Sequence, residues 1–283
     1  MKIITSVSEM QSTAEALRRQ GKIIGFVPTM GYLHKGHTSL MSYARRLSDI
    51  LVTTIFVNPT QFAPNEDFER YPRDFERDRQ LCESEGTSII FAPSNEEMYP
   101  AGFETYVSVE GISTILEGNF RPNHFRGVAT VVAKLFTVTK PHIAVFGQKD
   151  IQQLFVIRKM VKDLNLDIQI EMAPIVREPD GLAMSSRNVY LGPEDRKHAT
   201  SLFRSLKFAE DKIKTGERSI EKIKEGMLAI IERENPTVID YIAFVDTERF
   251  AELHELRSSS VIIALAVRFG STRLIDNFFI QIQ

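Results

Sequence analysis

Two histidines, His34 and His37, stand three positions apart in residues 28–37, which read Pro-Thr-Met-Gly-Tyr-Leu-His-Lys-Gly-His. The segment lies between a predicted strand and a predicted helix. At a helix start, side chains three apart share a face, and two imidazoles there can donate hydrogen bonds to one anion. The helix N-terminus adds backbone N–H groups, and Gly31 and Gly36 allow a close approach. The segment therefore predicts a phosphate-binding loop; the alternative is a loop with two exposed histidines.

Two known signatures compete for this segment. Residues 31–38 nearly fit the P-loop pattern G-x-x-x-x-G-K-[ST], but His37 occupies the position of the lysine that reaches the phosphates. We therefore reject a P-loop. The run His-x-Gly-His is similar to the nucleotide-binding signature of nucleotidylyltransferases and class I aminoacyl-tRNA synthetases. This similarity favours a nucleotide as the ligand.

Two further polar segments follow predicted strands at residues 50–57 and 143–146. Asn58 and Gln61 supply carboxamides, which can bind both the hydroxyl and the carboxylate of a hydroxy acid. An ordinary Asn-Pro turn is the alternative there. Lys149 stands at a predicted helix start, where it could offset phosphate charge or simply form a solvated pair with the aspartate beside it. Taken alone, each segment leaves both interpretations open.

A fourth polar segment, residues 184–188, reads Met-Ser-Ser-Arg-Asn and follows the Pro-Asp-Gly sequence of residues 179–181. Two hydroxyls and a guanidinium in a mobile loop suit a triphosphate, because arginine binds phosphate bidentately. The segment looks like the second synthetase signature, Lys-Met-Ser-Lys-Ser, without its lysines. The alternative is a polar linker between domains.

The elements that position these segments change character along the chain. Up to residue 173, β-rich runs alternate with helical patterns, which is typical of a parallel sheet covered on both faces. Two amphipathic helices and three strands follow, which indicates a separate α+β domain. Strands are expected at residues 2–5, 23–27, 50–57, 88–91, 143–146, 168–173, 239–245, 261–269 and 274–282, and the C-terminal helices at residues 193–214 and 219–233. We predict an α/β fold: a Rossmann-like parallel sheet with helices on both faces over residues 1–175, plus a smaller C-terminal α+β domain over residues 176–283.

Composition and charge argue against several classes of protein. The chain has 283 residues, 43% of them hydrophobic and 25% charged, as in ordinary globular proteins. Its net charge of −2 argues against a general nucleic-acid-binding surface. Its single cysteine, Cys82, cannot form an internal disulfide. The N-terminus lacks a signal-peptide pattern, and the longest apolar run, residues 261–267, is too short to span a bilayer. We expect a cytoplasmic protein that binds neither nucleic acid nor membrane.

Together and in this order, the four polar segments resemble the pantothenate synthetase family, the pantoate–β-alanine ligases of the nucleotidylyltransferase superfamily. Residues 70–73, Arg-Tyr-Pro-Arg, and residues 124–128, His-Phe-Arg-Gly-Val, also look like that family. The resemblance runs over essentially the whole chain. It implies an ATP-dependent ligase that condenses pantoate with β-alanine through a pantoyl-adenylate, releasing AMP and pyrophosphate. It also implies Mg²⁺ as the companion of ATP and a homodimer.

The resemblance further implies which residues handle ATP. His37 would act as the acid that supports the departing pyrophosphate, and His34 would contact the phosphates beside it. With Lys149 and Arg187, these histidines would form the catalytic set. The residues expected around ATP are Met30, Gly31, Tyr32, Leu33, His34, Lys35, Gly36, His37, Gly147, Gln148, Lys149, Asp150, Val176, Met184, Ser185, Ser186 and Arg187.

The same resemblance assigns the remaining ligands. Gln61 and Gln153 would hold pantoate, Gln61 would also help to bind β-alanine, and Asp78 is a candidate Mg²⁺ ligand. Two other functions stay open from the residues themselves. One is a nucleotidyltransferase without an amine acceptor, which would not release AMP in response to β-alanine. The other is a non-catalytic nucleotide sensor, which would bind ATP without pyrophosphate exchange.

Overall fold

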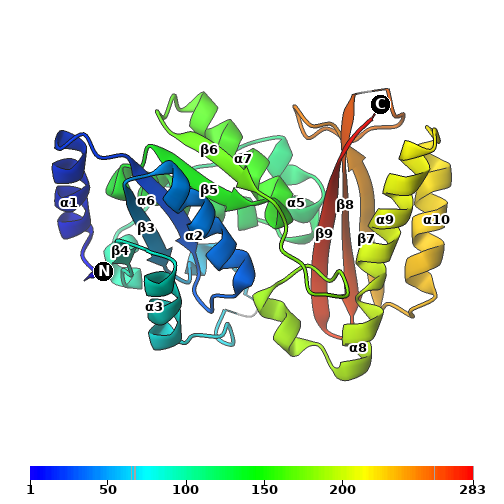
Figure 1. Ribbon diagram of the computed structural model, residues 1–283, viewed down its shortest axis with the longest axis horizontal. Coiled ribbons are helices and arrows are strands. Elements are labelled where there is room, and N and C mark those ends of the chain that lie inside the picture. Colours follow the sequence, from blue (N-terminus) through cyan, green and yellow to red (C-terminus); the bar gives the residue numbers. More distant parts are fainter. Residues whose placement is uncertain (65, 67, 258, 283) are drawn as a thin grey trace. The chain divides into compact units, whose positions relative to one another are not determined.

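The computed structural model describes residues 1–64, 66, 68–257 and 259–282. The chain forms two compact units, each with its own sheet (Figure 1). The first unit comprises Met1–Gln148 and Gln152–Pro174, and the second comprises Lys149–Ile151 and Ile175–Gln283. The three residues Lys149–Ile151 therefore group with the second unit, although their neighbours in the chain belong to the first.

The first unit is built on a six-stranded sheet in which every pairing is parallel. The strands lie in the order β1-β4-β3-β2-β5-β6. From β4 to β6 this is the order of a Rossmann sheet, which reverses between β2 and β5. The predicted Rossmann-like sheet is therefore confirmed. Its strands are β1 (Lys2–Ile4), β2 (Ile24–Thr29), β3 (Ile50–Ile55), β4 (Ile89–Phe91), β5 (Ile143–Gly147) and β6 (Gln169–Ala173).

Helices cover this sheet because its central strands are apolar on both faces, as the buried Phe26, Val27 and Leu51 show. α2 packs against β2, β3, β5 and β6 and crosses in front of the sheet in Figure 1. α1 and α6 pack against each other and against β2. The helices up to residue 163 are α1 (Val7–Arg19), α2 (Lys35–Leu47), α3 (Phe75–Ser84), α4 (Asn95–Met98), α5 (Glu117–Phe120), α6 (His124–Thr139) and α7 (Ile151–Asp163), with 3₁₀ turns η1 (Pro59–Gln61), η2 (Ile112–Thr114) and η3 (Gln148–Asp150).

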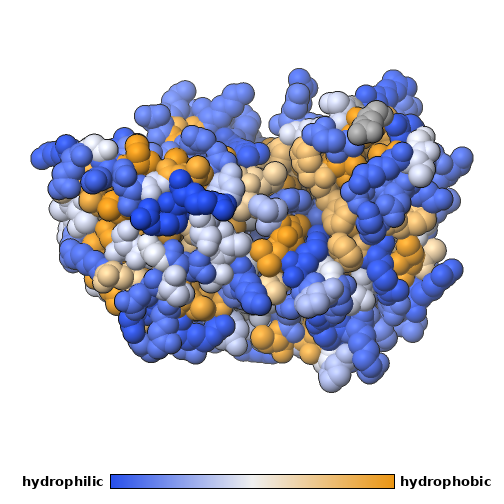
Figure 2. Space-filling view, viewed as in Figure 1, coloured by the Kyte–Doolittle hydropathy of each residue, from blue (hydrophilic) through white to orange (hydrophobic). Residues whose placement is uncertain are grey.

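The second unit packs helices against an antiparallel sheet of order β7-β8-β9. Leu206, Ile223 and Leu265 are buried in its core, whereas hydrophilic residues predominate over α9 and α10 on the face shown in Figure 2. Both helices are therefore amphipathic, as predicted. No helix of the described residues is long and apolar enough to cross a membrane. The elements are η4 (Ser186–Tyr190), α8 (Pro193–His198), α9 (Ser201–Lys214), α10 (Ile220–Glu232), β7 (Val238–Val245), β8 (Ser260–Phe269) and β9 (Thr272–Gln281).

The single helix expected over residues 193–214 is wrong, because the structure divides it into α8 and α9. Thr200 N bonds to Lys197 O at 3.2 Å, and Leu202 N bonds to Ala199 O at 3.2 Å. These bonds join residues three apart and tighten the chain into a 3₁₀-type turn. Ala199 and Thr200 keep right-handed helical dihedral angles. The amphipathic pattern therefore continues across the break and does not reveal it.

Candidate active site

The candidate site lies at the carboxyl ends of the central parallel strands. β2 ends just before Met30, β3 ends shortly before Asn58, and β5 ends at Gly147. β2 and β5 flank the point at which the strand order reverses, and open α/β sheets bind ligands there. The first three polar segments of the sequence therefore begin at the edge of the sheet where a ligand is expected.

His34 and His37 form the first turn of α2 through their own side chains. His34 Nδ1 accepts a hydrogen bond from Gly36 N at 3.1 Å, and His37 Nδ1 accepts one from His34 N at 3.3 Å. Because Nδ1 accepts in both rings, each neutral imidazole carries its proton on Nε2. The ring centroids lie 4.1 Å apart. The structure thus brings the two imidazoles side by side at a helix N-terminus, a position that suits an anion.

Asp78 holds the backbone of the loop that precedes these histidines. Its side chain is 1% exposed, and its two oxygens accept hydrogen bonds from Tyr32 N and Leu33 N, each at 2.7 Å. The bonds stabilise a turn in which Gly31 has φ of +82° and Tyr32 has φ of +48°. Burial raises the pKa of Asp78, and the two backbone donors oppose that rise. Asp78 is therefore a structural anchor of the loop.

The surroundings of Asp78 do not form a metal site by themselves. Both of its oxygens are engaged by backbone N–H groups. Within the described residues, no group of three or more His, Cys, Asp or Glu side chains could hold a metal ion. Mg²⁺ that accompanies a nucleotide takes many of its ligands from phosphates and water. The assignment of Asp78 as a Mg²⁺ ligand therefore stays a prediction.

A cavity of about 300 Å³ opens beside this loop. Met30, Gly31 and Asp78 line it together with Phe56, which follows β3, and with Arg73. Its volume is at the lower end of the range for small-molecule sites. The cavity therefore places three residues of the predicted site around one space.

A buried carboxamide network orients Gln61. Asn58, which is 1% exposed, donates from Nδ2 to Gln61 Oε1 at 3.1 Å and to Gly127 O at 3.2 Å. Asn58 Oδ1 accepts a hydrogen bond from the Tyr99 hydroxyl at 2.7 Å. Burial raises the pKa of Tyr99 to about 12, so this hydroxyl keeps its proton at neutral pH. Gln61 Nε2 lies 3.0 Å from Met30 Sδ, so its NH₂ group is the part directed towards the loop.

A second buried network holds the backbone of Gln61. His124 Nδ1 lies 2.8 Å from Gln61 O, and His124 Nε2 lies 3.1 Å from Arg121 Nη1. Arg121 also donates two hydrogen bonds of 2.7 Å to Glu66. A guanidinium can only donate, so His124 accepts at Nε2 and donates from Nδ1 to Gln61 O. Burial and the Arg121 charge lower the pKa of His124 to about 4, which keeps it neutral at pH 7.

At the start of α7, the buried glutamine is Gln152, a residue for which the sequence predicted no role. Its Nε2 donates to Ile112 O at 2.7 Å and to Ile115 O at 2.8 Å, and its Oε1 accepts from Glu117 N at 3.1 Å. Gln152 therefore ties α7 to η2 and α5. Gln153 is half-buried, and its assignment to pantoate stays a prediction.

In the second unit, a tight turn carries the expected phosphate-binding loop. Met184 N donates to Val176 O at 3.0 Å, which makes these two predicted ATP-binding residues neighbours. Ser185 then caps η4, because its hydroxyl accepts from Arg187 N at 3.2 Å. The polar segment therefore leads into the 3₁₀ turn η4 at the end of a hairpin.

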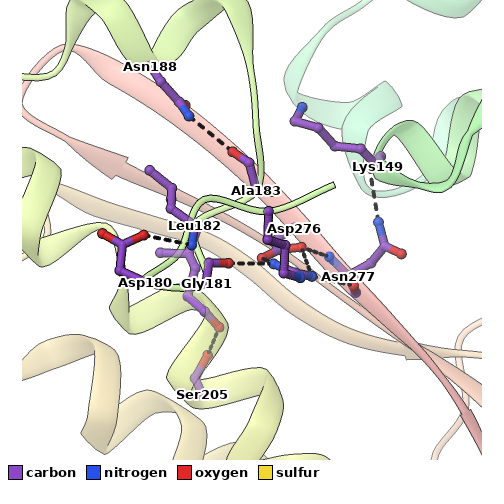
Figure 3. A network of polar contacts seen from close by, with 11 residues as sticks. Lys149, Asp180, Gly181, Leu182, Ala183, Asn188, Ser205, Asp276 and Asn277 are labelled. Atoms are coloured by element: carbon purple, nitrogen blue, oxygen red, sulfur yellow. Dashed lines mark hydrogen bonds and ion pairs between the residues drawn. The ribbon is translucent and has the colours of Figure 1, made fainter. Parts of the chain in front are cut away.

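A polar network of the second unit, which the sequence did not predict, reaches Lys149 (Figure 3). Asp276 on β9 accepts two hydrogen bonds from Arg177, at 2.7 and 2.9 Å. Its neighbour Asn277 donates from Nδ2 to Lys149 O at 3.0 Å. Lys149 Nζ lies 3.8 Å from Asp150 Oδ1, which is beyond hydrogen-bonding distance. Lys149 is therefore held in this unit through its backbone.

The predicted site residues divide between the two units. The first unit contains the Met30 loop, both histidines and both glutamines assigned to pantoate. The second contains Lys149, Asp150, Val176 and the loop of residues 184–187. The structure brings Gln61 next to Met30 and Val176 next to Met184, each pair within one unit. The assembly of both groups around one ATP stays a prediction.

The chain matches the family model described as Pantoate-beta-alanine ligase over residues 2–279. The chain belongs to the pantoate–β-alanine ligase family. Within it, the pantothenate synthetase of Acetivibrio thermocellus is 53% identical over 282 residues, covering 100% of both chains. The pantothenate synthetase of Thermotoga petrophila is 57% identical over 277 residues, covering 98% of this chain and 99% of its relative.

Solved structures from the pantoate–β-alanine ligase family share this fold. The pantothenate synthetase of Thermus thermophilus has a TM-score of 0.93 at 45% identity, covering 98% of this chain and 99% of that one. The pantoate–β-alanine ligase of Francisella tularensis, complexed with β-γ ATP and β-alanine, has a TM-score of 0.80 at 35% identity, covering 98% and 97%. The predicted family and fold are therefore confirmed, and the chain is a ligase that forms an amide bond.

Proposed function

We propose that this ligase uses ATP to convert pantoate into pantoyl-adenylate and then joins the pantoyl group to β-alanine. The observation that carries the proposal is the start of α2, where the adjacent imidazoles of His34 and His37 lie after β2, beside the switch point of a Rossmann sheet. Such a site suits nucleotide phosphates. The complex of the Francisella tularensis relative with β-γ ATP and β-alanine supports two of the three proposed substrates.

In the proposed first step, a carboxylate oxygen of pantoate attacks the α-phosphorus of ATP, and pyrophosphate leaves. Negative charge grows on the leaving group. His37 and His34 would donate hydrogen bonds to it, while Lys149 and Arg187 would add positive charge. Preorganised groups of this kind are usually the largest catalytic contribution. The reaction requires that the enzyme position the reactants and stabilise the negative charge, and no enzyme nucleophile takes part.

In the proposed second step, the neutral amine of β-alanine attacks the acyl carbon of pantoyl-adenylate. The acyl carbon–oxygen bond breaks, AMP leaves, and the nitrogen loses a proton. Gln61 would hold pantoate together with Gln153 and would also contact β-alanine. The networks around Asn58 and His124 fix Gln61 at its side chain and its backbone. A fixed carboxamide can hold the acid in an orientation that favours attack.

The two parts of the chain would have different roles in this scheme. Residues 1–175 would bind ATP and pantoate, and residues 176–283 would act as a lid whose residues 184–187 cover the phosphates. The adenylate is a mixed anhydride that water destroys, so closure would protect it. We also propose Mg²⁺ bound with ATP and a homodimer, which rest on the family resemblance. A cytoplasmic location is proposed from the N-terminal sequence and the short apolar runs.

Pantoate-dependent exchange of label between pyrophosphate and ATP tests this function. Exchange should require pantoate, should not require β-alanine, and should be weak with other small hydroxy acids. AMP should accumulate beyond one turnover only when β-alanine is added. Exchange without pantoate would favour another nucleotidyltransferase, and ATP binding without any exchange would favour a nucleotide sensor.

A further inference from the structure

Two neighbouring side chains of β9 reach two different parts of the second unit (Figure 3). Successive side chains of a strand point to opposite faces, so Asp276 and Asn277 leave β9 in opposite directions. Asp276 pairs with Arg177, and Asn277 donates to Lys149 O. The two β9 residues are 2% and 1% exposed. β9 therefore connects Lys149 with the hairpin that leads to the predicted phosphate-binding loop.

The contacts of Arg177 hold that hairpin against β9 and α9. Its guanidinium donates to both oxygens of Asp276 and, from Nη1, to Gly181 O at 2.9 Å. It also lies 4.9 Å from the ring centroid of Phe203 and 5.2 Å from that of Phe278. A buried ion pair contributes little net stability, because desolvation offsets the attraction. The planar, bidentate contact nevertheless defines position and angle.

On the other face of β9, Asn277 holds Lys149 by its backbone carbonyl. Asn277 Nδ2 donates to Lys149 O at 3.0 Å, and Asn277 N donates to Asp276 Oδ1 at 2.7 Å. One carboxylate therefore contacts both the guanidinium of Arg177 and the backbone of Asn277. The Lys149 ammonium pairs with Asp150 Oδ1 at 3.8 Å, and its charge also acts on the buried Asp276. The hydrogen bond from Asn277 fixes the backbone from which this side chain extends.

We propose that Asp276 and Asn277 are positioning residues for adenylate formation, because they set Lys149 and the hairpin of residues 176–184 in one fixed geometry. This inference rests on the proposed function, in which Lys149 and Arg187 meet the phosphates of ATP. The two β9 residues act through Lys149 and Arg177 and touch no reactant. They are required for the half-reaction that consumes ATP and have little effect once pantoyl-adenylate has formed.

Asn277→Leu tests the inference, because leucine keeps a similar volume and removes the donor to Lys149 O. Pantoate-dependent pyrophosphate exchange should fall about 30-fold, since a misplacement of about 1 Å can cost about 100-fold. Formation of pantothenate from isolated pantoyl-adenylate and β-alanine should stay within about threefold of wild type. Gln281→Leu removes an exposed carboxamide from the same strand and is the matched control, with both rates unchanged.

A loss of equal size in both half-reactions, or no loss in either, would overturn the inference, because a merely structural role does not separate them. If Asn277→Leu does not fold, Asn277→Ala is measured instead, and the same separation of the two rates is expected. Wild-type enzyme without pantoate-dependent exchange would refute the proposed function, and this inference with it. Wild-type exchange that Asn277→Leu leaves intact would refute this inference alone.

Discussion

Lowering the pH should destabilise the protein through the buried His124. Burial and the Arg121 guanidinium lower the pKa of His124 from 6.5 to about 4, because a second proton would add charge to a buried site and remove the acceptor at Nε2. In the unfolded chain the imidazole titrates near its ordinary value. Between the two values the unfolded state binds a proton that the folded state does not. The contribution to stability is therefore complete above pH 6.5 and is lost as the pH falls towards 4.

The size of this effect follows from the two pKa values. The lowering from 6.5 to about 4 corresponds to about 3 kcal/mol in the free energy of unfolding. About 2 kcal/mol of this should be lost by about pH 5. His124→Gln is the comparison, because glutamine can still donate to Gln61 O and does not titrate. When the free energy of unfolding of His124→Gln is subtracted from that of wild type, the contribution of carboxylates that titrate in both proteins cancels.

Urea unfolding followed by circular dichroism, at several pH values between about 7.5 and 4.5, measures this difference. The free energy of unfolding of wild type minus that of His124→Gln should fall by about 2 kcal/mol between pH 7.5 and 5. His254→Gln replaces an exposed histidine and is the control for the loss of an imidazole elsewhere in the chain. A constant difference for His124→Gln would refute the reasoning, because His124 would then be titrating normally in the folded state.

Three further substitutions test separate contacts. Tyr99→Phe removes the hydroxyl that donates to Asn58, so kcat/KM for pantoate should fall about tenfold; an unchanged value would separate this network from pantoate binding. Asp78→Asn replaces one of the two side-chain oxygens that accept from the loop backbone with an NH₂ donor, so KM for ATP should rise about tenfold. The Mg²⁺ concentration that gives half-maximal activity should not change; a changed value would favour metal ligation by Asp78. Gly127→Ala would place a Cβ 2.2 Å from Thr60 O and should lower stability by about 2 kcal/mol; a wild-type melting temperature would contradict the close packing of α6 on η1.

Local patterns in the sequence predicted the segments of the site well. The strand–loop–helix context of His34 and His37 is confirmed, since β2 ends at Thr29 and α2 starts at Lys35. The apolar strands and their alternation with helices were enough to predict the parallel sheet. Both signals come from residues that are close together in the chain, where periodicity and capping act directly.

The partners that hold these segments could not be predicted in the same way. Tyr99 is 41 positions from Asn58, Arg121 is 55 from Glu66, and Arg177 is 99 from Asp276. Each pairing depends on the tertiary fold, and no local spacing connects the two residues. Buried polar residues such as Asp276 read as ordinary strand positions until their partners are known.

The grouping of Lys149 with the second unit was also beyond the sequence. Lys149 follows Gly147, the last residue of β5, so its position in the chain places it with the parallel sheet. The contact that draws it into the other unit comes from Asn277, 128 positions further on. Hydrophobic periodicity and turn residues do not indicate that three residues belong to a different unit from their neighbours in the chain.

Transfer of oxygen from pantoate to AMP tests the central claim most directly. Pantoate labelled with ¹⁸O in both carboxylate oxygens is converted with ATP and β-alanine, and the products are analysed by mass spectrometry. If a carboxylate oxygen attacks the α-phosphorus, each AMP should contain one ¹⁸O atom, and pyrophosphate should contain none. Unlabelled AMP, or label in a phosphate released together with ADP, would contradict a pantoyl-adenylate.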